Sequence, residues 1–449
     1  MIASPLGGRD VIAAALAVSL AFAFAAAHSP LLAIVAIIGI IAVSWIVSRA
    51  ELVLLVLVAA LPWEAMLQYP SPTLSLVKMV GVALAAAYVF RASRLGETVR
   101  MPATIVLALL FGMAVAVSLV ASPDPGAGFA KAFRYAFFIG FLFLIAQIVS
   151  ERKDAMHLLR VFCLSAAAAG LFGLLSFVAG DVGRAAGPIE DANDFGYLLA
   201  TALPIAALLF IEDRRMRSLW AASAVVLLAA TLATFSRGAL VGLGALVVWL
   251  VLSRRISTTW VVSIGLGAIA VVALALTLWS PLINERLEEK NKISERNVSS
   301  RTAFWSAAQE MTYDNPVFGV GPARFGEEAP RYVRNNPIAL SDPVVHNSYL
   351  EILAEDGLIA LGLYLAMLAS AWVAASRYEG ARRAAEDPSG ARLAAAIKGM
   401  LIVAIVSGIF LSEQVAPPIW LACALAASGA LSTEPALRRA RVELGAATA

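Results

Sequence analysis

Charged side chains are scarce in this chain of 449 residues. They make up 14% of the sequence, whereas 61% of the residues are hydrophobic and the mean hydropathy is +0.83. Soluble globular proteins carry about 25% charged residues. This deficit excludes a water-soluble enzyme and indicates a membrane protein. The formal net charge is only +3, and Lys and Arg occur in short clusters between apolar runs, so nucleic acid is not an expected partner.

Cysteine and histidine are also rare. The chain has two cysteines, Cys163 and Cys423, and three histidines, His28, His157 and His346. Isolated residues of this kind do not build a His/Cys metal site, and the sequence contains no P-loop, nucleophile elbow or paired zinc motif. We therefore expect neither a metal nor another cofactor. Any catalysis would rest on a general base and on electrostatics.

Long apolar runs, by contrast, recur along the whole chain. A helix needs about 20 mostly apolar residues to cross a bilayer. The sequence accordingly predicts fourteen spans, near residues 11–27, 30–48, 51–67, 73–91, 102–121, 130–150, 157–179, 195–211, 216–233, 235–253, 258–279, 358–376, 394–412 and 416–432. We predict an all-α, polytopic integral membrane protein with about 12–14 transmembrane helices.

Composition divides the chain into three parts. Residues 1–279 hold about eleven spans, residues 280–357 form one large loop with short helices, and residues 358–449 hold the last spans and a tail. If the chain crosses fourteen times from a cytoplasmic N-terminus, nineteen Lys and Arg residues face the cytoplasm and only Arg184 lies in a short loop on the other side. We therefore expect both termini in the cytoplasm and the large loop on the external face of the cytoplasmic membrane.

Three cations lie near membrane depth, where an ionisable group is costly unless it faces a cavity or a partner. Arg237 follows Ser236 between two apolar runs, and it either caps a tight helical hairpin or binds an anion, with Gly238 letting the backbone turn closely. Lys131 and Arg134 share one face of the sixth predicted span. These two either pair with lipid head groups or contact a substrate.

The large loop contains a first candidate helix that begins after Ser299 and Ser300. Arg301 and Trp305 stand at i and i+4 and so share a face of this helix. A cation near a helix start opposes the helix dipole, and a bound anion would relieve this. The sequence therefore predicts an anion near Arg301.

A second candidate helix in the loop follows His346 and ends at Gly357. Ser341 or Asp342 is its expected N-cap. We expect an apolar stripe of this helix to face the membrane and to hold the His346 imidazole at the bilayer surface; the stripe is Leu350, Leu353 and Ala354. A lone histidine is more often a structural residue, which is the alternative interpretation of His346.

Five motifs occur in the order typical of one family of membrane enzymes. They are Asp191–Gly196, Ser236–Gly238, Arg301 with Trp305, Gly319–Pro322 with Phe325, and His346–Asn347 followed by Leu350, Glu351, Glu355 and Gly357. Over roughly residues 185–415 the chain resembles the O-antigen ligase / O-antigen polymerase superfamily of bacterial membrane glycosyltransferases, which have a GT-C-like architecture.

The resemblance implies transfer of a glycan from an undecaprenyl-diphosphate-linked donor to an acceptor hydroxyl on the external face. By position, Arg237 and Arg301 would hold the donor's diphosphate and His346 would be the general base. One base without a carboxylate nucleophile predicts inversion at the anomeric carbon. Further candidate substrate contacts are Asn193, Asp194, Lys131, Arg134, Trp305 and Asn347.

The acceptor separates the functions that the resemblance leaves open. A ligase transfers to a lipid anchor, a polymerase to another lipid-linked glycan, and a protein O-oligosaccharyltransferase to a protein hydroxyl. We favour a ligase. A protein with this many spans could instead be a lipid-linked oligosaccharide flippase, which would need ionisable residues through the midplane, or an inactive scaffold, which would leave the shared external positions of Arg237, Arg301 and His346 unexplained.

Overall fold

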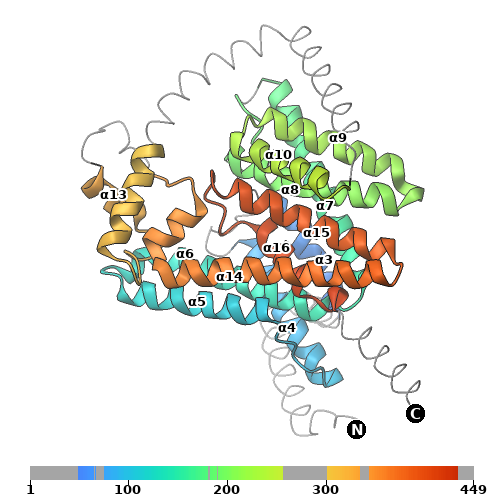
Figure 1. Ribbon diagram of the computed structural model, residues 1–449, viewed down its shortest axis with the longest axis horizontal. Coiled ribbons are helices and arrows are strands. Elements are labelled where there is room, and N and C mark those ends of the chain that lie inside the picture. Colours follow the sequence, from blue (N-terminus) through green and yellow to red (C-terminus); the bar gives the residue numbers. More distant parts are fainter. Residues whose placement is uncertain are drawn as a thin grey trace, which may run out of the picture.

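The structure is a computed structural model that describes residues 49–64, 66, 75–180, 183–189, 191–255, 301–333 and 343–432. Every regular element in these ranges is a helix, so the expected all-α fold is confirmed (Figure 1). The helices are α3 Ala50–Ala60, η1 Leu61–Trp63, α4 Leu76–Leu95, α5 Ala103–Ala121, α6 Pro125–Ile148, α7 Arg152–Val178, α8 Ala192–Glu212, η2 Arg214–Met216, α9 Arg217–Ala233, α10 Arg237–Leu252, α13 Phe325–Tyr332, α14 Ser348–Ala384, α15 Pro388–Ser407, α16 Pro417–Ala427 and η4 Gly429–Leu431. Residues 301–314 are also helical.

Seven of the described helices are long and apolar enough to cross a membrane: α5, α6, α7, α8, α9 with η2, α14 and α15. Shorter apolar helices are α3 with η1, α10 and α16. Each predicted run that falls within the described ranges overlaps a helix, which confirms a polytopic membrane protein. The runs predicted at 11–27, 30–48 and 258–279 lie outside the described residues, so the total number of spans stays a prediction.

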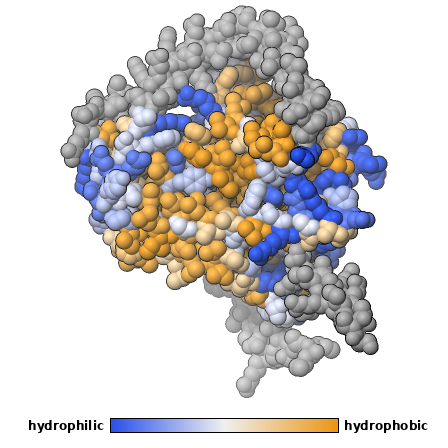
Figure 2. All heavy atoms as spheres, in the orientation of Figure 1, coloured by the Kyte–Doolittle hydropathy of each residue, from blue (hydrophilic) through white to orange (hydrophobic). Residues whose placement is uncertain are grey.

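The surface has an apolar band between polar regions. Figure 2 shows hydrophobic residues across the middle of the molecule and hydrophilic residues gathered at its left and right ends. Large apolar side chains on α5 are exposed, among them Met113, Val117 and Val120. An apolar surface of this extent is unfavourable in water. The band is therefore the part of the surface that contacts lipid.

Helix α8 positions one wall of the site described below. It packs against α7, α9, α10 and α15, and Phe195, Leu199 and Ile205 on it are fully buried. Asp191 caps its start by accepting hydrogen bonds from the N–H groups of Asn193 and Asp194. Because its neighbours enclose α8, the first turn and its polar side chains are held in place.

Helix α14 is broken at Gly357, which adopts φ 82° and ψ 179°. The break leaves backbone groups that residues 316–321 satisfy: Val320 N–H donates to Ala354 O at 3.0 Å, and Leu358 N–H donates to Pro316 O at 2.9 Å. A Cβ on Gly357 would lie 2.1 Å from Val317 O, so only glycine fits there. The prediction that Gly357 ends the first helix is confirmed.

Two expectations for this helix were wrong. Its N-cap is Asn347, whose Oδ1 accepts from the N–H groups of Tyr349 and Leu350 at 3.0 Å each, whereas Ser341 and Asp342 lie outside the described residues. The apolar stripe does not face the membrane, because Leu350 and the buried Ala354 pack on a cluster within the large loop. That cluster includes Phe304, Ala308, Val320 and Phe325.

Candidate functional site

Arg237 lies in the first turn of α10, where the Ser236 side chain caps the helix by accepting from Ala239 N–H at 3.4 Å. The sharp turn before it is made by Phe235, with φ 51°, and not by Gly238 as expected. Gly238 instead allows close packing, because a Cβ there would lie 2.9 Å from Leu411 Cγ. The Arg237 side chain is exposed, and it forms no hydrogen bond or ion pair with any other described residue.

Arg301 approaches Arg237 through the loop between α15 and α16, residues 408–416, which we call the 408–416 loop. Arg301 Nη1 donates to Phe410 O at 3.4 Å. Just before this loop, Ser407 Oγ donates to Gly238 O at 3.1 Å, next to Arg237. The two arginines predicted to bind diphosphate are therefore brought to the same segment of backbone.

A third arginine, Arg184, lies near these two. The sequence analysis predicted only that Arg184 is the one cation in the short loops of the external side. Its Nε donates to Thr234 O at 2.8 Å, three residues before Arg237. Its Nη2 donates to Asn193 Oδ1 at 2.9 Å. Asn193, a candidate substrate contact, thus orients Arg184. The polar, glycine-rich composition of residues 180–194 indicates a functional segment around Arg184. Its position in the sequence does not show that Arg184 lies near Arg237.

The arginines also influence one another electrostatically. Burial, and then the charges of Arg237 and Arg184, hold the pKa of Arg301 below its usual range, while Asp191 acts in the opposite direction. The pKa of Arg184 is likewise lowered by burial and by Arg237, and Asp191 again opposes the shift. Mutual repulsion between cations without a paired carboxylate is relieved by a bound anion. We call Arg184, Arg237 and Arg301 the arginine cluster.

His346 has a strained backbone conformation, with φ 50°, and its neighbours in the chain contact segments that also hold the arginine cluster. The preceding Val345 O accepts from Trp305 Nε1 at 2.9 Å, one turn along the helix from Arg301. Two residues after His346, Ser348 N–H donates to Gly408 O at 2.8 Å and to Leu411 O at 2.9 Å. A left-handed conformation costs a non-glycine residue of order 1–3 kcal/mol and is concentrated at functional sites.

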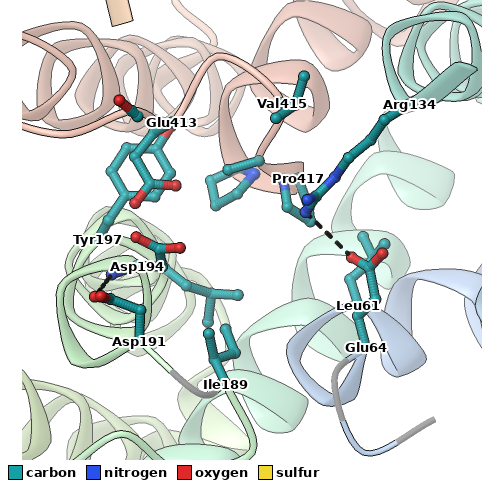
Figure 3. A pocket seen from close by; sticks show the side chains of 14 residues that line it. Leu61, Glu64, Arg134, Ile189, Asp191, Asp194, Tyr197, Glu413, Val415 and Pro417 are labelled. Carbon is teal, nitrogen blue, oxygen red and sulfur yellow. Dashed lines mark hydrogen bonds and ion pairs between the residues drawn. The ribbon is translucent and has the colours of Figure 1, made fainter. Parts of the chain in front are cut away.

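A pocket opens beside the first turn of α8 (Figure 3). Asp194, Tyr197 and Glu413 lie on one side of it, and Arg134 and Glu64 on the other, with 3.9 Å between Arg134 Nη2 and Glu64 Oε2. Glu413, in the 408–416 loop, was not among the residues that the sequence indicated. Asp194 and Arg134, both candidate substrate contacts, line this pocket.

Other candidate contacts have partners within the protein. Lys131 is nearly buried between Glu351 and Glu355, and Gln414 Nε2 donates to Glu351 Oε1 at 2.7 Å. The Trp305 indole N–H donates to Val345 O, and Asn347 caps α14. Within the described part of the chain, no group of three or more His, Cys, Asp or Glu side chains is arranged to hold a metal ion.

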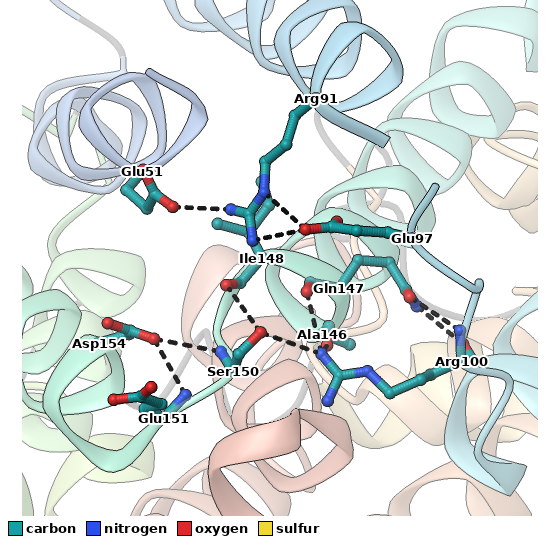
Figure 4. A network of polar contacts seen from close by, with 10 residues as sticks. All are labelled: Glu51, Arg91, Glu97, Arg100, Ala146, Gln147, Ile148, Ser150, Glu151 and Asp154. Atoms are coloured by element: carbon teal, nitrogen blue, oxygen red, sulfur yellow. Dashed lines mark hydrogen bonds and ion pairs between the residues drawn. The ribbon is translucent and has the colours of Figure 1, made fainter. Parts of the chain in front are cut away.

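The opposite ends of the helices carry a different kind of polar network (Figure 4). Arg91 pairs with Glu51 at 2.7 Å and with Glu97 at 3.0 Å. Arg100 Nη2 donates to Gln147 O at 3.0 Å. Arg91 is thus neutralised by two carboxylates, whereas Arg100 is held by hydrogen bonds. In contrast, no member of the arginine cluster forms an ion pair with a described carboxylate.

Together these features define a polytopic, all-helical membrane protein with a cationic site and an adjoining acidic pocket at one end of its helices. Residues 222–365 match the family model described as O-Antigen ligase, and the matched stretch includes Arg237, Arg301 and His346. The chain is also similar to an O-antigen ligase of Pseudomonas aeruginosa, with 34% identity over 141 residues. This match spans about a third of the length of that relative, 31%, and 31% of this chain.

Proposed function

We propose that this protein is a ligase-type membrane glycosyltransferase. It moves a glycan from an undecaprenyl-diphosphate-linked donor to an acceptor hydroxyl on the external face of the cytoplasmic membrane, with both termini in the cytoplasm. The observation that carries the proposal is the convergence of Arg184, Arg237 and Arg301 without described carboxylate partners. His346 stands two residues before Ser348, whose N–H donates to the same 408–416 loop that Arg301 contacts. The similarity to O-antigen ligases supports it.

The arginine cluster stabilises the leaving group in this proposal. A lipid diphosphate gains charge as the glycosidic bond breaks, and guanidinium groups bind its oxygens in a planar, bidentate manner. The donor is already activated, so the external face needs no ATP. The cations supply the positive charge that a metal ion would otherwise provide, and the proposed reaction is therefore metal-independent.

His346 deprotonates the acceptor hydroxyl. An unperturbed imidazole titrates near neutral pH, which suits a general base. The acceptor oxygen then attacks the anomeric carbon, the bond to the diphosphate oxygen breaks, and the proton passes to the imidazole. A single displacement of this kind inverts the anomeric configuration, whereas retention would need a carboxylate nucleophile.

Two alternatives remain within the family and one outside it. A polysaccharide polymerase or a protein O-oligosaccharyltransferase would use the same donor site with another acceptor. A flippase would carry the donor through the bilayer. The described polar cluster lies at one end of the helices rather than through their middle, and this favours a transferase.

The test uses purified full-length protein in lipid nanodiscs with a labelled undecaprenyl-diphosphate glycan and lipid, glycan and protein acceptors. We expect transfer with release of undecaprenyl diphosphate. Arg301→Lys should reduce the rate at least about tenfold, because a point charge loses the planar fork. Arg331→Lys, on an exposed arginine of α13, is the matched control and should have no effect. Movement of intact donor across vesicles without transfer would contradict the proposal.

A further inference from the structure

The 408–416 loop is the segment on which the parts of the proposed site meet. Phe410 O in this loop accepts a hydrogen bond from Arg301 Nη1 at 3.4 Å. Ser348, two residues after His346, donates its N–H to two further carbonyls of the loop, at 2.8 Å and 2.9 Å. The position of the loop therefore sets where the Arg301 guanidinium lies and where the chain that carries His346 is attached.

The loop has no regular structure of its own to hold this position. Its residues form turns and irregular backbone between the end of α15 and the start of α16. Segments of this kind open locally at low cost unless side-chain contacts hold them. Two such contacts exist, because Ser412 Oγ donates to Glu351 Oε2 and Gln414 Nε2 donates to Glu351 Oε1 at 2.7 Å. Both carboxylate oxygens of Glu351 are thus bonded to the loop.

Glu351 is a fixed, charged anchor for these bonds. It lies in the first turn of α14, is 9% exposed, and pairs with Lys131 of α6. Hydrogen bonds to a charged group are roughly twice as strong as neutral ones, and a buried setting strengthens them further. Asn347 already caps α14, so the start of this helix does not account for the carboxylate. The contacts of Glu351 instead join α14 and α6 to the 408–416 loop.

Arg301 needs a fixed acceptor because a neighbouring cation repels it. The charge of Arg237 acts on Arg301, and among the described residues no carboxylate is paired with Arg301. A guanidinium next to a like charge keeps one position only if an acceptor of fixed position holds it. Phe410 O is such an acceptor as long as the loop stays in place. The position matters, because a displacement of about 1 Å at a site that orients reacting groups can cost about 10²-fold in rate.

We propose that Glu351 is a positioning residue for the diphosphate site. By holding two side chains of the 408–416 loop it fixes the loop, and through Phe410 O the loop holds Arg301 within the arginine cluster. Glu351 itself touches no substrate. This inference rests on the proposed function and deepens it, because the site that binds the leaving group is kept in place by a carboxylate outside that site.

The first experiment measures how firmly Arg301 is held, without using activity. Phenylglyoxal modifies accessible arginine side chains, and mass spectrometry gives its rate at Arg301 in purified full-length protein, relative to the exposed Arg331 of α13. Ser412→Ala and Gln414→Met each remove one hydrogen bond to Glu351. Each should raise the rate at Arg301 at least about twofold, because the loop then opens more often.

Ser389→Ala is the matched control for this labelling. The Ser389 hydroxyl also donates to a glutamate, Glu212, but at the other end of α15. This variant should label at the wild-type rate, and Ser412→Thr, which keeps the hydroxyl, should return to that rate. An unchanged rate at Arg301 in both Ser412→Ala and Gln414→Met would overturn the positioning role.

The second experiment tests whether the effect reaches the ligand through Arg301. The probe is undecaprenyl diphosphate without sugar, and native mass spectrometry of the full-length protein measures its affinity. Ser412→Ala should weaken binding at least about threefold, with the melting temperature little changed because Glu351 keeps its bonds to Lys131 and Gln414. In an Arg301→Lys background, Ser412→Ala should weaken binding no further.

The outcomes separate this inference from the proposed function. An unchanged affinity in Ser412→Ala, or an equal loss in the wild-type and Arg301→Lys backgrounds, would overturn the positioning role, because Ser412 would then not act through Arg301. If the wild type does not bind undecaprenyl diphosphate at all, the proposed function fails, while the labelling of Arg301 still tests whether Glu351 holds the loop.

Discussion

Glu413 is a carboxyl group buried where its charge is poorly compensated. Burial and the proximity of Asp194 raise its pKa, and Arg134 opposes the shift only weakly. An acid whose pKa is raised by folding contributes stability that is fully present below its ordinary pKa, near 4.5. That contribution is lost as the pH rises through the raised value. The contribution of Glu413 should therefore lower the free energy of unfolding as the pH increases.

Replacing Glu413 by glutamine tests whether this carboxyl group makes the protein less stable as the pH rises. Glutamine keeps the shape and stays neutral, so Glu413→Gln should show a smaller fall in melting temperature between pH 5 and pH 8 than the wild type. The two proteins should converge at the acidic end. The measurement is differential scanning fluorimetry in detergent across this range. A variant that loses stability with pH as steeply as the wild type would show that Glu413 is ionised in the folded protein.

At the residue scale, the sequence did not indicate that Arg184 belongs to the arginine cluster. Arg237 and Arg301 belong to motifs whose neighbours make them recognisable, and His346 is one of few histidines. Arg184 reaches the same place only because Thr234 O and Asn193 Oδ1 hold its guanidinium. A contact across fifty residues of chain depends on how α8 and α9 pack, which hydropathy does not encode.

At the scale of elements, a buried ionic network connects the parts that carry the site. Lys131 of α6 lies between Glu351 and Glu355 of α14, and Glu351 also accepts from Ser412 and Gln414. Glu355 in addition accepts from Ala323 N–H at 2.9 Å. The network therefore fixes the first part of α14, the 408–416 loop and residues 321–325 relative to one another.

Lys131→Met should be strongly destabilising, because it leaves two buried carboxylates without their cation. Breaking a buried pair costs about 3–5 kcal/mol. The measurement is the melting temperature of the purified protein, which should fall clearly below that of the wild type. Lys153→Met, on an exposed lysine that pairs only with Glu151, is the control and should melt like the wild type. Equal melting temperatures for the two variants would mean that Lys131 does not hold the network together.

Hydropathy predicted the described helices well but not how the large loop packs. Residues that contact lipid and residues that contact protein are both apolar, so the stripe with Leu350 and Ala354 gave no sign that it packs inside the loop. The break at Gly357 was predictable, because glycine ends helices. The cap at Asn347 was not predicted, because hydropathy does not fix the residue at which this helix begins.

At the scale of the whole molecule, the arginine cluster differs from the cations that the fold pairs with carboxylates. Arg91 is paired with Glu51 and Glu97, Lys131 with Glu351 and Glu355, and Arg152 with Asp387 at 2.8 Å. The arginine cluster has no such partner among the described residues. Cations that a fold leaves uncompensated indicate where it binds an anion. The positive-inside pattern of the sequence predicts that the cluster faces the outside.

The matched family domain covers only part of this site. Arg237, Arg301 and His346 lie within residues 222–365, whereas Arg184, Asp194 and Glu413 lie outside them. The residues inside the domain, and Asp194 outside it, were predictable from their motifs. Arg184 and Glu413 were not, because Arg184 is placed by its contacts with Thr234 and Asn193 and Glu413 by the position of the 408–416 loop beside α8.

The most direct test of the account is the initial rate of glycan transfer by His346→Ala, measured with saturating undecaprenyl-diphosphate glycan. His157→Ala, on an exposed histidine in the second turn of α7, is the matched control. We predict that His346→Ala folds normally and transfers about 10²–10⁴-fold more slowly, as loss of a general base requires, while His157→Ala is fully active. Wild-type transfer by His346→Ala would contradict the account.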